Sequence, residues 1–284
     1  MIYGIPYKGS KNAIADKLVD VLPSCDRFLD ACCGGGAITV AACLSGKFEA
    51  VVANDLNPAV VKLLDAVLIH KGQIEYNHPS VCSRQDFVES LERISSGNFS
   101  IQDCVNKFCA SFGNDGKTYL YGKHVEDYKL TAERMLTAPT LEERRKAYRK
   151  FYANVMKGSR LNELQYLQRV QSLERLERLE RLDIFNIDYS QYDCVYFDIP
   201  YKGTNKYDFD FDHERFYELF KSIKIPAFMS EYDAPFTCVA SFDHVSRMAA
   251  KVGSKGKIQG LEKLFFNRSF EEYNKLMEKT RYGS

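Results

Sequence analysis

The chain has 284 residues, of which 45% are hydrophobic and 27% are charged, so it can bury a substantial core and is not disordered throughout. Its 39 Lys and Arg residues almost balance its 38 Asp and Glu residues, and any surface for a polyanion must therefore be local. No apolar run approaches the ~18 residues of a membrane span and the amino terminus lacks a signal-peptide pattern, which predicts a cytoplasmic protein that does not bind membranes.

The first part of the chain alternates short apolar runs with helical patterns. The runs at 26–31 and 49–53 are apolar or β-branched and end in turn residues, as buried parallel strands do. The first is followed by glycines at 34–36 and a helical pattern, and the second by a turn and a helix through Leu68. This order predicts an α/β fold with a doubly wound, Rossmann-like sheet.

The ends of these two strands predict a cofactor site. Asp30 ends the first strand, and Gly34 and Gly36 lack the Cβ that would keep a ligand from the backbone. Asp55 follows the second strand, where a carboxylate can accept hydrogen bonds from both ribose hydroxyls. These features indicate a cofactor that contains adenosine. They fit NAD as well as S-adenosylmethionine, although Thr39 stands where the G-x-G-x-x-G fingerprint would have its last glycine.

The middle of the chain changes in character between about Lys71 and Leu182. Helical segments rich in Tyr, Arg and Lys replace the alternation of strands and helices until it resumes at Ile184. We therefore assign residues 69–183 to an inserted, mainly helical region. Residues 1–68 and 184–284 are assigned to the α/β domain that carries the predicted cofactor site.

Two stretches of this insertion indicate what the protein could bind, either a nucleic acid or a second copy of itself. The basic residues between 144 and 160 are interleaved with aromatic ones, which fits a surface that faces phosphates and fits a solvated helix face equally well. The Leu-Glu-Arg repeat at 173–182 contains strong helix formers and predicts a short helical spacer. Its leucines recur every third residue and do not form one coiled-coil seam, so we expect a monomer, with a dimerising coil as the alternative.

The apolar run 193–197 predicts a third buried strand, and it is followed directly by Asp198-Ile199-Pro200-Tyr201. Open α/β sheets bind ligands at this carboxyl end of their strands. The tetrapeptide resembles the D-P-P-Y motif of DNA methyltransferases that act on amino groups. Segments 6–11, 28–36 and 54–57 resemble further motifs of the DNA adenine methyltransferase family, in that family's order. The resemblance covers roughly residues 1–68 and 184–266.

This resemblance implies that the chain transfers a methyl group from S-adenosylmethionine to the N6 amino group of adenine, flipped out of duplex DNA. The amino nitrogen is a poor nucleophile because its lone pair is delocalised into the ring. By analogy with the family, the Asp198 carboxylate and the backbone carbonyl of Ile199 accept the amino hydrogens, and Tyr201 stacks on the base. Ile199 departs from the usual proline, but Pro200 still restrains residue 199 to extended conformations.

Further positions match the family's contacts to the cofactor. Tyr7 and Lys11 match positions that contact its methionine end, and Asp198 is counted with the cofactor-binding residues as well as with the catalytic ones. Asp188 is similar to an acidic position that meets the cofactor's adenine, and it fits a turn-forming aspartate almost as well. Cys32 stands where the family commonly has an aromatic side chain.

The sequence predicts no metal site. Its nine cysteines include no C-x-x-C pair and have no zinc-like histidine spacing, so we expect free thiols. The acidic run 208–212 lacks the glycine and the glutamate of a calcium loop, since His213 and Leu219 stand at those positions. A strand leading to an Asp212 helix cap is the better interpretation. The basic loop 251–257 fits a clamp on a DNA backbone and, equally, a solvated loop.

Two alternatives remain open from the sequence. The same chemistry serves methyltransferases that act on cytosine, RNA or glutamine side chains, although the motif order and the large insertion favour duplex DNA. A protein of this fold that binds DNA without catalysis is the other alternative. The recognition sequence depends on the geometry of a few side chains and is not read from the sequence.

Overall fold

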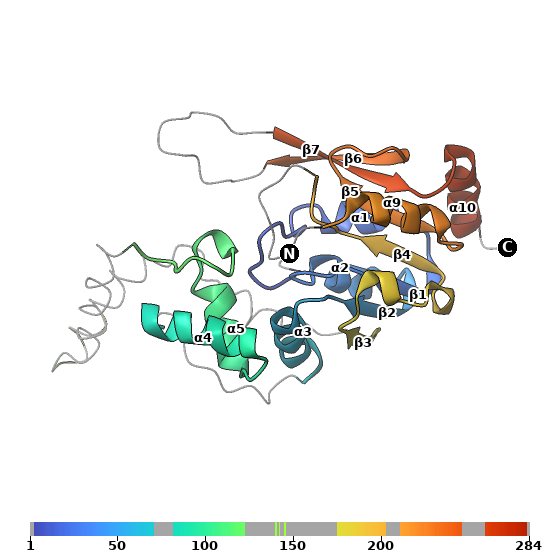
Figure 1. Ribbon diagram of the computed structural model, residues 1–284. Helices are drawn as coiled ribbons and strands as arrows, with labels where there is room; N and C mark the ends of the chain where they lie inside the picture. The colour runs from blue at the N-terminus through green and yellow to red at the C-terminus, as the bar shows by residue number, and fades with distance from the viewer. Residues whose placement is uncertain are drawn as a thin grey trace. The chain divides into compact units, whose positions relative to one another are not determined.

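The computed structural model describes residues 3–70, 82–122, 175–202, 211–245 and 259–282, together with 140, 142 and 145. The chain divides into two compact units. The first consists of Met1–Gly4, Gly9–Asp65 and Val170–Ser284, and the second of Ile5–Lys8 and Ala66–Arg169 (Figure 1). The basic residues of 144–160 other than Arg145, and the loop 251–257, lie outside the described residues.

The first unit is built on a seven-stranded sheet in the order β3-β2-β1-β4-β5-β7-β6. The five strands from β3 to β5 are parallel to their neighbours, whereas β7 is antiparallel to both β5 and β6. The strands span Cys25–Asp30 (β1), Phe48–Asn54 (β2), Leu176–Glu180 (β3), Cys194–Phe197 (β4), Ala227–Glu231 (β5), Thr237–Val245 (β6) and Gln259–Phe266 (β7). The three strands predicted from apolar runs are therefore confirmed as β1, β2 and β4.

Helices complete the first unit, and their starts follow the capping chemistry of the sequence. They are α1 (Ala15–Asp20), α2 (Ala37–Ser45), α3 (Pro58–Leu64), α9 (His213–Ser222) and α10 (Phe270–Tyr282), and α3 continues into a π-helical turn at Asp65–Ile69. The Asp212 side chain accepts a hydrogen bond from the Arg215 N–H, which confirms the predicted cap of α9. The strand expected before that cap falls largely on residues 203–210, outside the described part.

Both faces of the sheet are covered by aromatic packing. On one face, the ring of Phe197 lies 5.2 Å from that of Phe216 in α9. On the other face, Phe228 stacks on Phe266 at 4.9 Å, and Tyr273 of α10 contacts both rings. The sheet is thus a buried central layer with helices on each side, as in a doubly wound fold (Figure 1).

The prediction of a helical spacer at 173–182 is wrong. Residues Leu176–Glu180 form β3, which pairs in parallel with β2 from Val51 to Asn54. A leucine every third residue gives no single apolar helix face, so a helix here would be favoured only by the helix propensity of its residues. A strand instead satisfies the backbone hydrogen-bonding groups along the edge of β2, and this favours the strand. Because β3 lies within 69–183, the sheet includes part of the range that the sequence pattern assigns to the insertion.

In the second unit the described part includes the α-helices α4 (Arg84–Ser96) and α5 (Ile101–Cys109), followed by a 3-10 turn at Phe112–Asn114. Each begins with a capping box, formed by Ser83 with Asp86 and by Ser100 with Asp103. Asp103 also forms an ion pair with Arg93 at 2.8 Å, which joins the two helices. These local interactions explain the two α-helices that the structure describes in this stretch.

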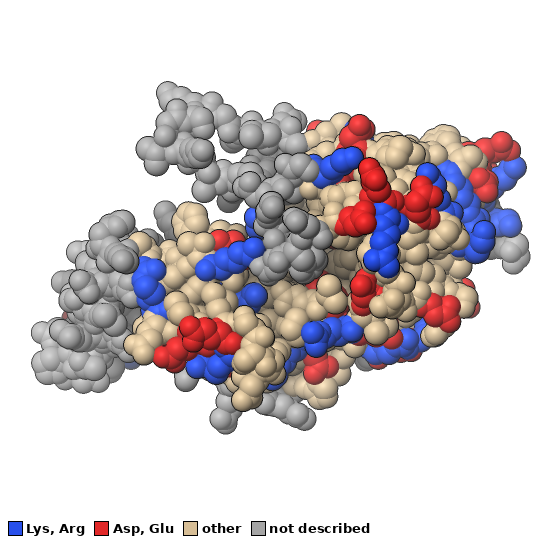
Figure 2. Space-filling model, in the orientation of Figure 1, with Lys and Arg blue, Asp and Glu red and all other residues tan. Residues whose placement is uncertain are grey.

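The described surface carries charges of both signs. On the face shown in Figure 2, basic and acidic side chains are interspersed, in keeping with a net charge of +1. Among the described residues, no helix has the length and hydropathy needed to cross a membrane.

Candidate active site

Three predicted site carboxylates meet at one edge of the sheet. Strand β1 lies between β2 and β4, and its last residue, Asp30, is level with Ala53 and Tyr196. Asp55 and Asp198 follow β2 and β4 within one residue of their ends. The chain leaves β1 for β2 on one side and returns to β4 on the other, so this edge is the topological switch point, where open α/β sheets bind ligands.

Asp30 is a buried carboxylate with one oxygen left unsatisfied. Its Oδ2 accepts a 2.6 Å hydrogen bond from the Thr39 hydroxyl, whereas its Oδ1 has no hydrogen-bond partner in the described part of the protein. Burial raises the pKa of Asp30 to about 7, against the hydrogen bond from Thr39, and the nearby carboxylates of Asp198 and Asp55 raise it further. A buried, unpaired carboxylate oxygen is suited to a cationic donor from a ligand.

Asp55 accepts backbone hydrogen bonds through both of its oxygens, one from the glycine loop and one from its own turn. Oδ2 accepts a hydrogen bond from the Gly34 N–H at 2.9 Å, and Oδ1 accepts one from the Asn57 N–H at 2.8 Å. Burial raises its pKa, and these two backbone donors oppose the rise. A carboxylate has about four acceptor sites, so two remain for hydroxyl groups of a ligand. Asp55 therefore both holds the loop and offers acceptors beside it.

The glycine loop is shaped by positions that exclude side chains. Gly36 caps α2 with a φ of 80°, and a Cβ there would lie 3.1 Å from Leu64 Cδ2. A Cβ on Gly4 would lie 2.5 Å from the carbonyl oxygen of Gly35, so the amino-terminal segment packs directly against the loop backbone. The prediction of a close backbone turn is confirmed in its geometry.

Lys11 binds the carboxylate of Asp198, the residue of the tetrapeptide that is predicted to be catalytic. Its Nζ is 2.6 Å from both Asp198 Oδ1 and Oδ2, and its side chain is buried. Burial raises the pKa of Asp198 to about 6, while the ammonium of Lys11 opposes that rise and the carboxylate of Glu262 adds to it. Asp198 therefore accepts hydrogen bonds from a nitrogen donor, and above pH 6 it is mainly ionised.

Tertiary contacts hold the backbone of the tetrapeptide. The Ile199 side chain is 1% exposed and belongs to the core cluster on the α9 face of the sheet. The Pro200 carbonyl lies 2.8 Å from His213 Nε2, which must be the donor because a carbonyl only accepts. Glu231, at the end of β5, accepts the N–H of Lys202 at 3.0 Å and that of Tyr232 at 2.8 Å.

Tyr201 has its hydroxyl fixed by a residue that sequence reasoning missed. The hydroxyl donates to Glu262 Oε1 of β7 at 2.7 Å, and the ring packs edge to face against Tyr232 at 4.7 Å. Lys11 Nζ lies 4.9 Å from the centre of the ring and 3.6 Å from Glu262 Oε1. No sequence motif marks Glu231, Glu262 or His213. Each contacts the tetrapeptide or the residues next to it only because folding packs its strand or helix beside them.

Tyr7 and Asp188 are two further positions predicted to bind the cofactor. Tyr7 belongs to the second unit, where its ring is 5.8 Å from that of Phe108. Asp188 is exposed, and its oxygens accept hydrogen bonds from Ser190 and Gln191 within a turn. Cys32 is partly buried against the core cluster, and burial raises the pKa of its thiol. The cofactor contacts of Tyr7 and Asp188 stay predictions.

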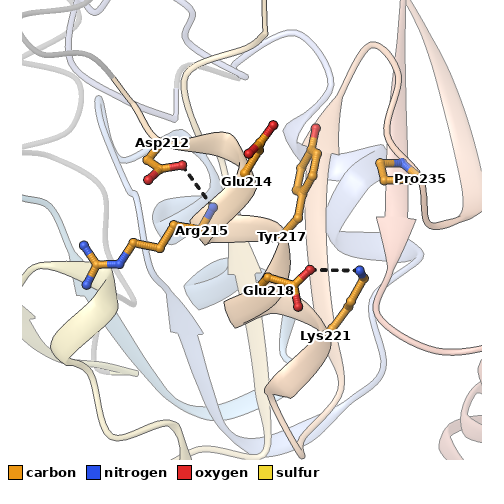
Figure 3. A pocket seen from close by; sticks show the side chains of 7 residues that line it. All are labelled: Asp212, Glu214, Arg215, Tyr217, Glu218, Lys221 and Pro235. Carbon is orange, nitrogen blue, oxygen red and sulfur yellow. Dashed lines mark hydrogen bonds and ion pairs between the residues drawn. The ribbon is translucent and has the colours of Figure 1, made fainter.

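A separate pocket of about 510 Å³ lies along α9. Figure 3 shows its lining, in which Glu218 forms a 3.1 Å ion pair with Lys221. None of the carboxylates at the switch point lines it. Within the described ranges, no group of three His, Cys, Asp or Glu side chains is arranged to hold a metal ion.

A comparison with protein families gives one match, to the model described as D12 class N6 adenine-specific DNA methyltransferase. The matched residues, 7–253, include the glycine loop, the strand ends at the switch point and the tetrapeptide. No curated protein matches the sequence significantly.

Proposed function

Because the family model covers most of the chain, the protein belongs to the D12 class of N6 adenine-specific DNA methyltransferases, and we propose that Asp198 is its catalytic acceptor. The enzyme uses S-adenosylmethionine, which supplies the methyl group as part of a sulfonium cation. The observation that carries the proposal is the contact at Asp198. Both of its oxygens already accept hydrogen bonds from a nitrogen donor, Lys11, beside the ring of Tyr201.

The proposed chemistry is electrostatic and positional. The Asp198 carboxylate and the Ile199 carbonyl accept the two hydrogens of the adenine amino group, so that its lone pair points out of the ring plane toward the methyl carbon. The new N–C bond forms from that lone pair, and the electrons of the broken S–C bond stay on sulfur. The amino nitrogen then loses one proton to Asp198 or to water, which leaves N6-methyladenine.

The residues at the switch point fit a cationic cofactor that contains adenosine. The unsatisfied oxygen of Asp30 is placed to accept from a cationic donor, and its pKa of about 7 would fall once a cation neutralised it. Asp55 has acceptor capacity for ribose hydroxyls, and Gly34 and Gly36 shape the loop between them. Lys11, Tyr7 and Asp188 keep their proposed cofactor roles from the family resemblance.

We further propose that the substrate is duplex DNA, from which the target adenine is flipped to stack on Tyr201, and that the second unit contributes target recognition. Asp198 is only partly exposed, and enzymes that do chemistry on a base take it out of the stack to reach it, which supports flipping. A monomer is also proposed, because the repeat that offered a dimerising coil forms β3 instead. Light scattering of the purified protein tests the monomer.

The site assignment is tested with labelled cofactor, mixed-sequence duplex DNA and digestion to nucleosides. Asp198→Ala is expected to lower the rate of labelling of adenine by on the order of 10²–10³-fold or more, because it removes a preorganised acceptor. Asp233→Ala is the matched control, since that carboxylate is exposed and pairs with Lys263. Unchanged turnover of Asp198→Ala would refute the site. Equal labelling of single-stranded DNA or RNA would refute the preference for a duplex.

A further inference from the structure

Glu262 is a buried carboxylate that touches two parts of the proposed site. It lies in β7, opposite Phe242 of β6, and is 4% exposed. Its Oε1 accepts the Tyr201 hydroxyl at 2.7 Å and lies 3.6 Å from Lys11 Nζ. These partners come from the tetrapeptide and from the amino-terminal segment, so one side chain joins regions that are far apart in the sequence.

A carboxylate in this position is costly for the fold. Burying a charge is unfavourable unless it is paired and hydrogen-bonded, and an apolar side chain of similar size would usually fill a sheet interior at no greater cost. Asp198 and Glu231 are nearby, and their carboxylates add to the unfavourable charge of this region. Stability alone therefore does not account for a glutamate here.

We propose that Glu262 is a positioning residue for methyl transfer, which orients the ring of Tyr201 for the base and receives the ammonium of Lys11 when adenine reaches Asp198. The inference rests on the proposed roles of Asp198 and Tyr201.

The hydrogen bond to Tyr201 fixes the plane of its ring. One side of the ring packs against Tyr232 at 4.7 Å, and the hydroxyl at the far end is held by Glu262. Because the Tyr201 ring is held by both contacts, it loses little conformational freedom when a base stacks on it. This favours binding and orientation of that base. Removing the acceptor would leave the hydroxyl without this hydrogen bond and would allow the ring to tilt.

The contact to Lys11 concerns access to Asp198. The ammonium occupies both oxygens of Asp198, at 2.6 Å each, and one of these oxygens must accept a hydrogen from the adenine amino group. Each oxygen keeps a further acceptor site, but the ammonium lies against both of them, so we infer that it shifts as the base enters. Glu262 is already within ion-pair distance, at 3.6 Å, so a short movement keeps the lysine paired. Without that carboxylate the displaced ammonium would lose this ion-pair partner.

A double-mutant cycle tests the first role. Glu262→Leu, Tyr201→Phe and the double variant are assayed with labelled cofactor and mixed-sequence duplex DNA, and their cofactor affinities are measured by calorimetry. We expect Glu262→Leu to lower kcat roughly 10- to 100-fold, the range for losing a hydrogen bond to a charged group. The double variant should lose less than the product of the two single losses, because both changes remove the same bond. Cofactor affinity should stay within about threefold of wild type, since no cofactor-binding residue is altered.

Glu262→Gln tests the second role, because its amide oxygen still accepts the Tyr201 hydroxyl while its charge is gone. Its kcat should lie between those of wild type and Glu262→Leu. The matched control is Glu218→Gln, which removes the exposed charge paired with Lys221 in α9 (Figure 3) and should leave kcat unchanged. If Glu262→Leu does not fold, a cycle of Glu262→Gln with Lys11→Met replaces the first one. Both of these changes remove the same ion pair, so their losses should again combine to less than their product.

Two results would overturn the inference. One is wild-type kcat in both Glu262 variants, and the other is a double variant whose loss equals the product of the single losses. Failure of the proposed site itself gives a different pattern, in which Asp198→Ala and Tyr201→Ala also retain wild-type turnover. Full loss in those two variants with normal Glu262 variants would refute the role of Glu262 alone.

Discussion

The two halves of the proposed active site are held in different ways. In the proposed cofactor half, one buried oxygen of Asp30 has no hydrogen-bond partner among the described residues, and Asp55 is bonded to backbone N–H groups of the glycine loop and of its own turn. In the base half, Lys11 donates to both oxygens of Asp198, and the Tyr201 hydroxyl donates to Glu262. The first half offers a buried acceptor to a cationic ligand, whereas in the second half an incoming base must share Asp198 with a cation that is already in place.

This difference has an energetic meaning. An unpaired buried carboxylate destabilises the free protein, and a cationic ligand relieves that cost on binding. A paired carboxylate costs the free protein less, but its substrate must compete with a lysine already in place. We therefore expect substitutions of Asp30 to raise the stability of the free protein and to weaken cofactor binding. Substitutions in the base half should mainly change turnover.

Apart from the loss of Asp198 itself, the largest effect is expected for Asp30→Asn. Losing a charged acceptor should weaken S-adenosylmethionine binding by roughly 10- to 150-fold, which corresponds to about 1.5–3 kcal/mol. Because the folded-state pKa of about 7 lies above the usual 3.8, ionised Asp30 lowers stability as pH rises through that window. The variant should therefore melt a few degrees higher than wild type at pH 8. Calorimetry and thermal unfolding check the two effects, and tighter binding would contradict the comparison.

Lys11→Met should alter the pH dependence of turnover. The ammonium opposes the upward shift of the Asp198 pKa from burial, so its removal should raise that pKa above its present value of about 6. The acid limb of the kcat profile, where Asp198 is protonated, should move to higher pH by the same amount. Turnover at pH 7 should fall severalfold, and by about tenfold if the pKa of Asp198 reaches roughly 8. An acid limb that stays in place would show that Lys11 does not control Asp198.

Wild-type cofactor affinity should itself depend on pH. Asp30 is ionised only above its pKa of about 7, and a cation binds the ionised form. Binding should therefore weaken about tenfold per pH unit below 7 and reach a plateau above it. Adenosine, which has no cationic end, is the matched control and should bind with little change between about pH 6 and 8. A pH-independent affinity for S-adenosylmethionine would place its charge away from Asp30.

The smallest effect is expected for Ile199→Pro. The carbonyl proposed to accept the second amino hydrogen is retained, and Pro200 and His213 still constrain the following peptide. Turnover should stay within about threefold of wild type, while the melting temperature falls because Ile199 is buried in the core cluster, where lost methyl groups cost about 1 kcal/mol. Initial rates and thermal unfolding test this, and a large loss of turnover would show that the second acceptor is wrongly assigned.

The sequence by itself determined the parts of the protein that depend on neighbours along the chain. Strands β1, β2 and β4, the glycine turn and the order of the motifs follow from apolar runs and from residues that fix local backbone geometry. Asp30, Asp55 and Asp198 could be placed together because parallel strands bring their carboxyl ends to one edge. The Asp212 cap is predictable for a related reason, since a helix cap is a local interaction.

Only the tertiary structure decided the features that depend on distant neighbours. The Leu-Glu-Arg repeat became β3 because the edge of β2 offered backbone hydrogen bonds that helix propensity could not outweigh. Glu262, Glu231 and His213 acquired their contacts from strands and a helix brought beside the tetrapeptide by folding. Whether a carboxylate is paired, as Asp198 is, or left with an unsatisfied oxygen, as Asp30 is, depends on burial and on partners in three dimensions.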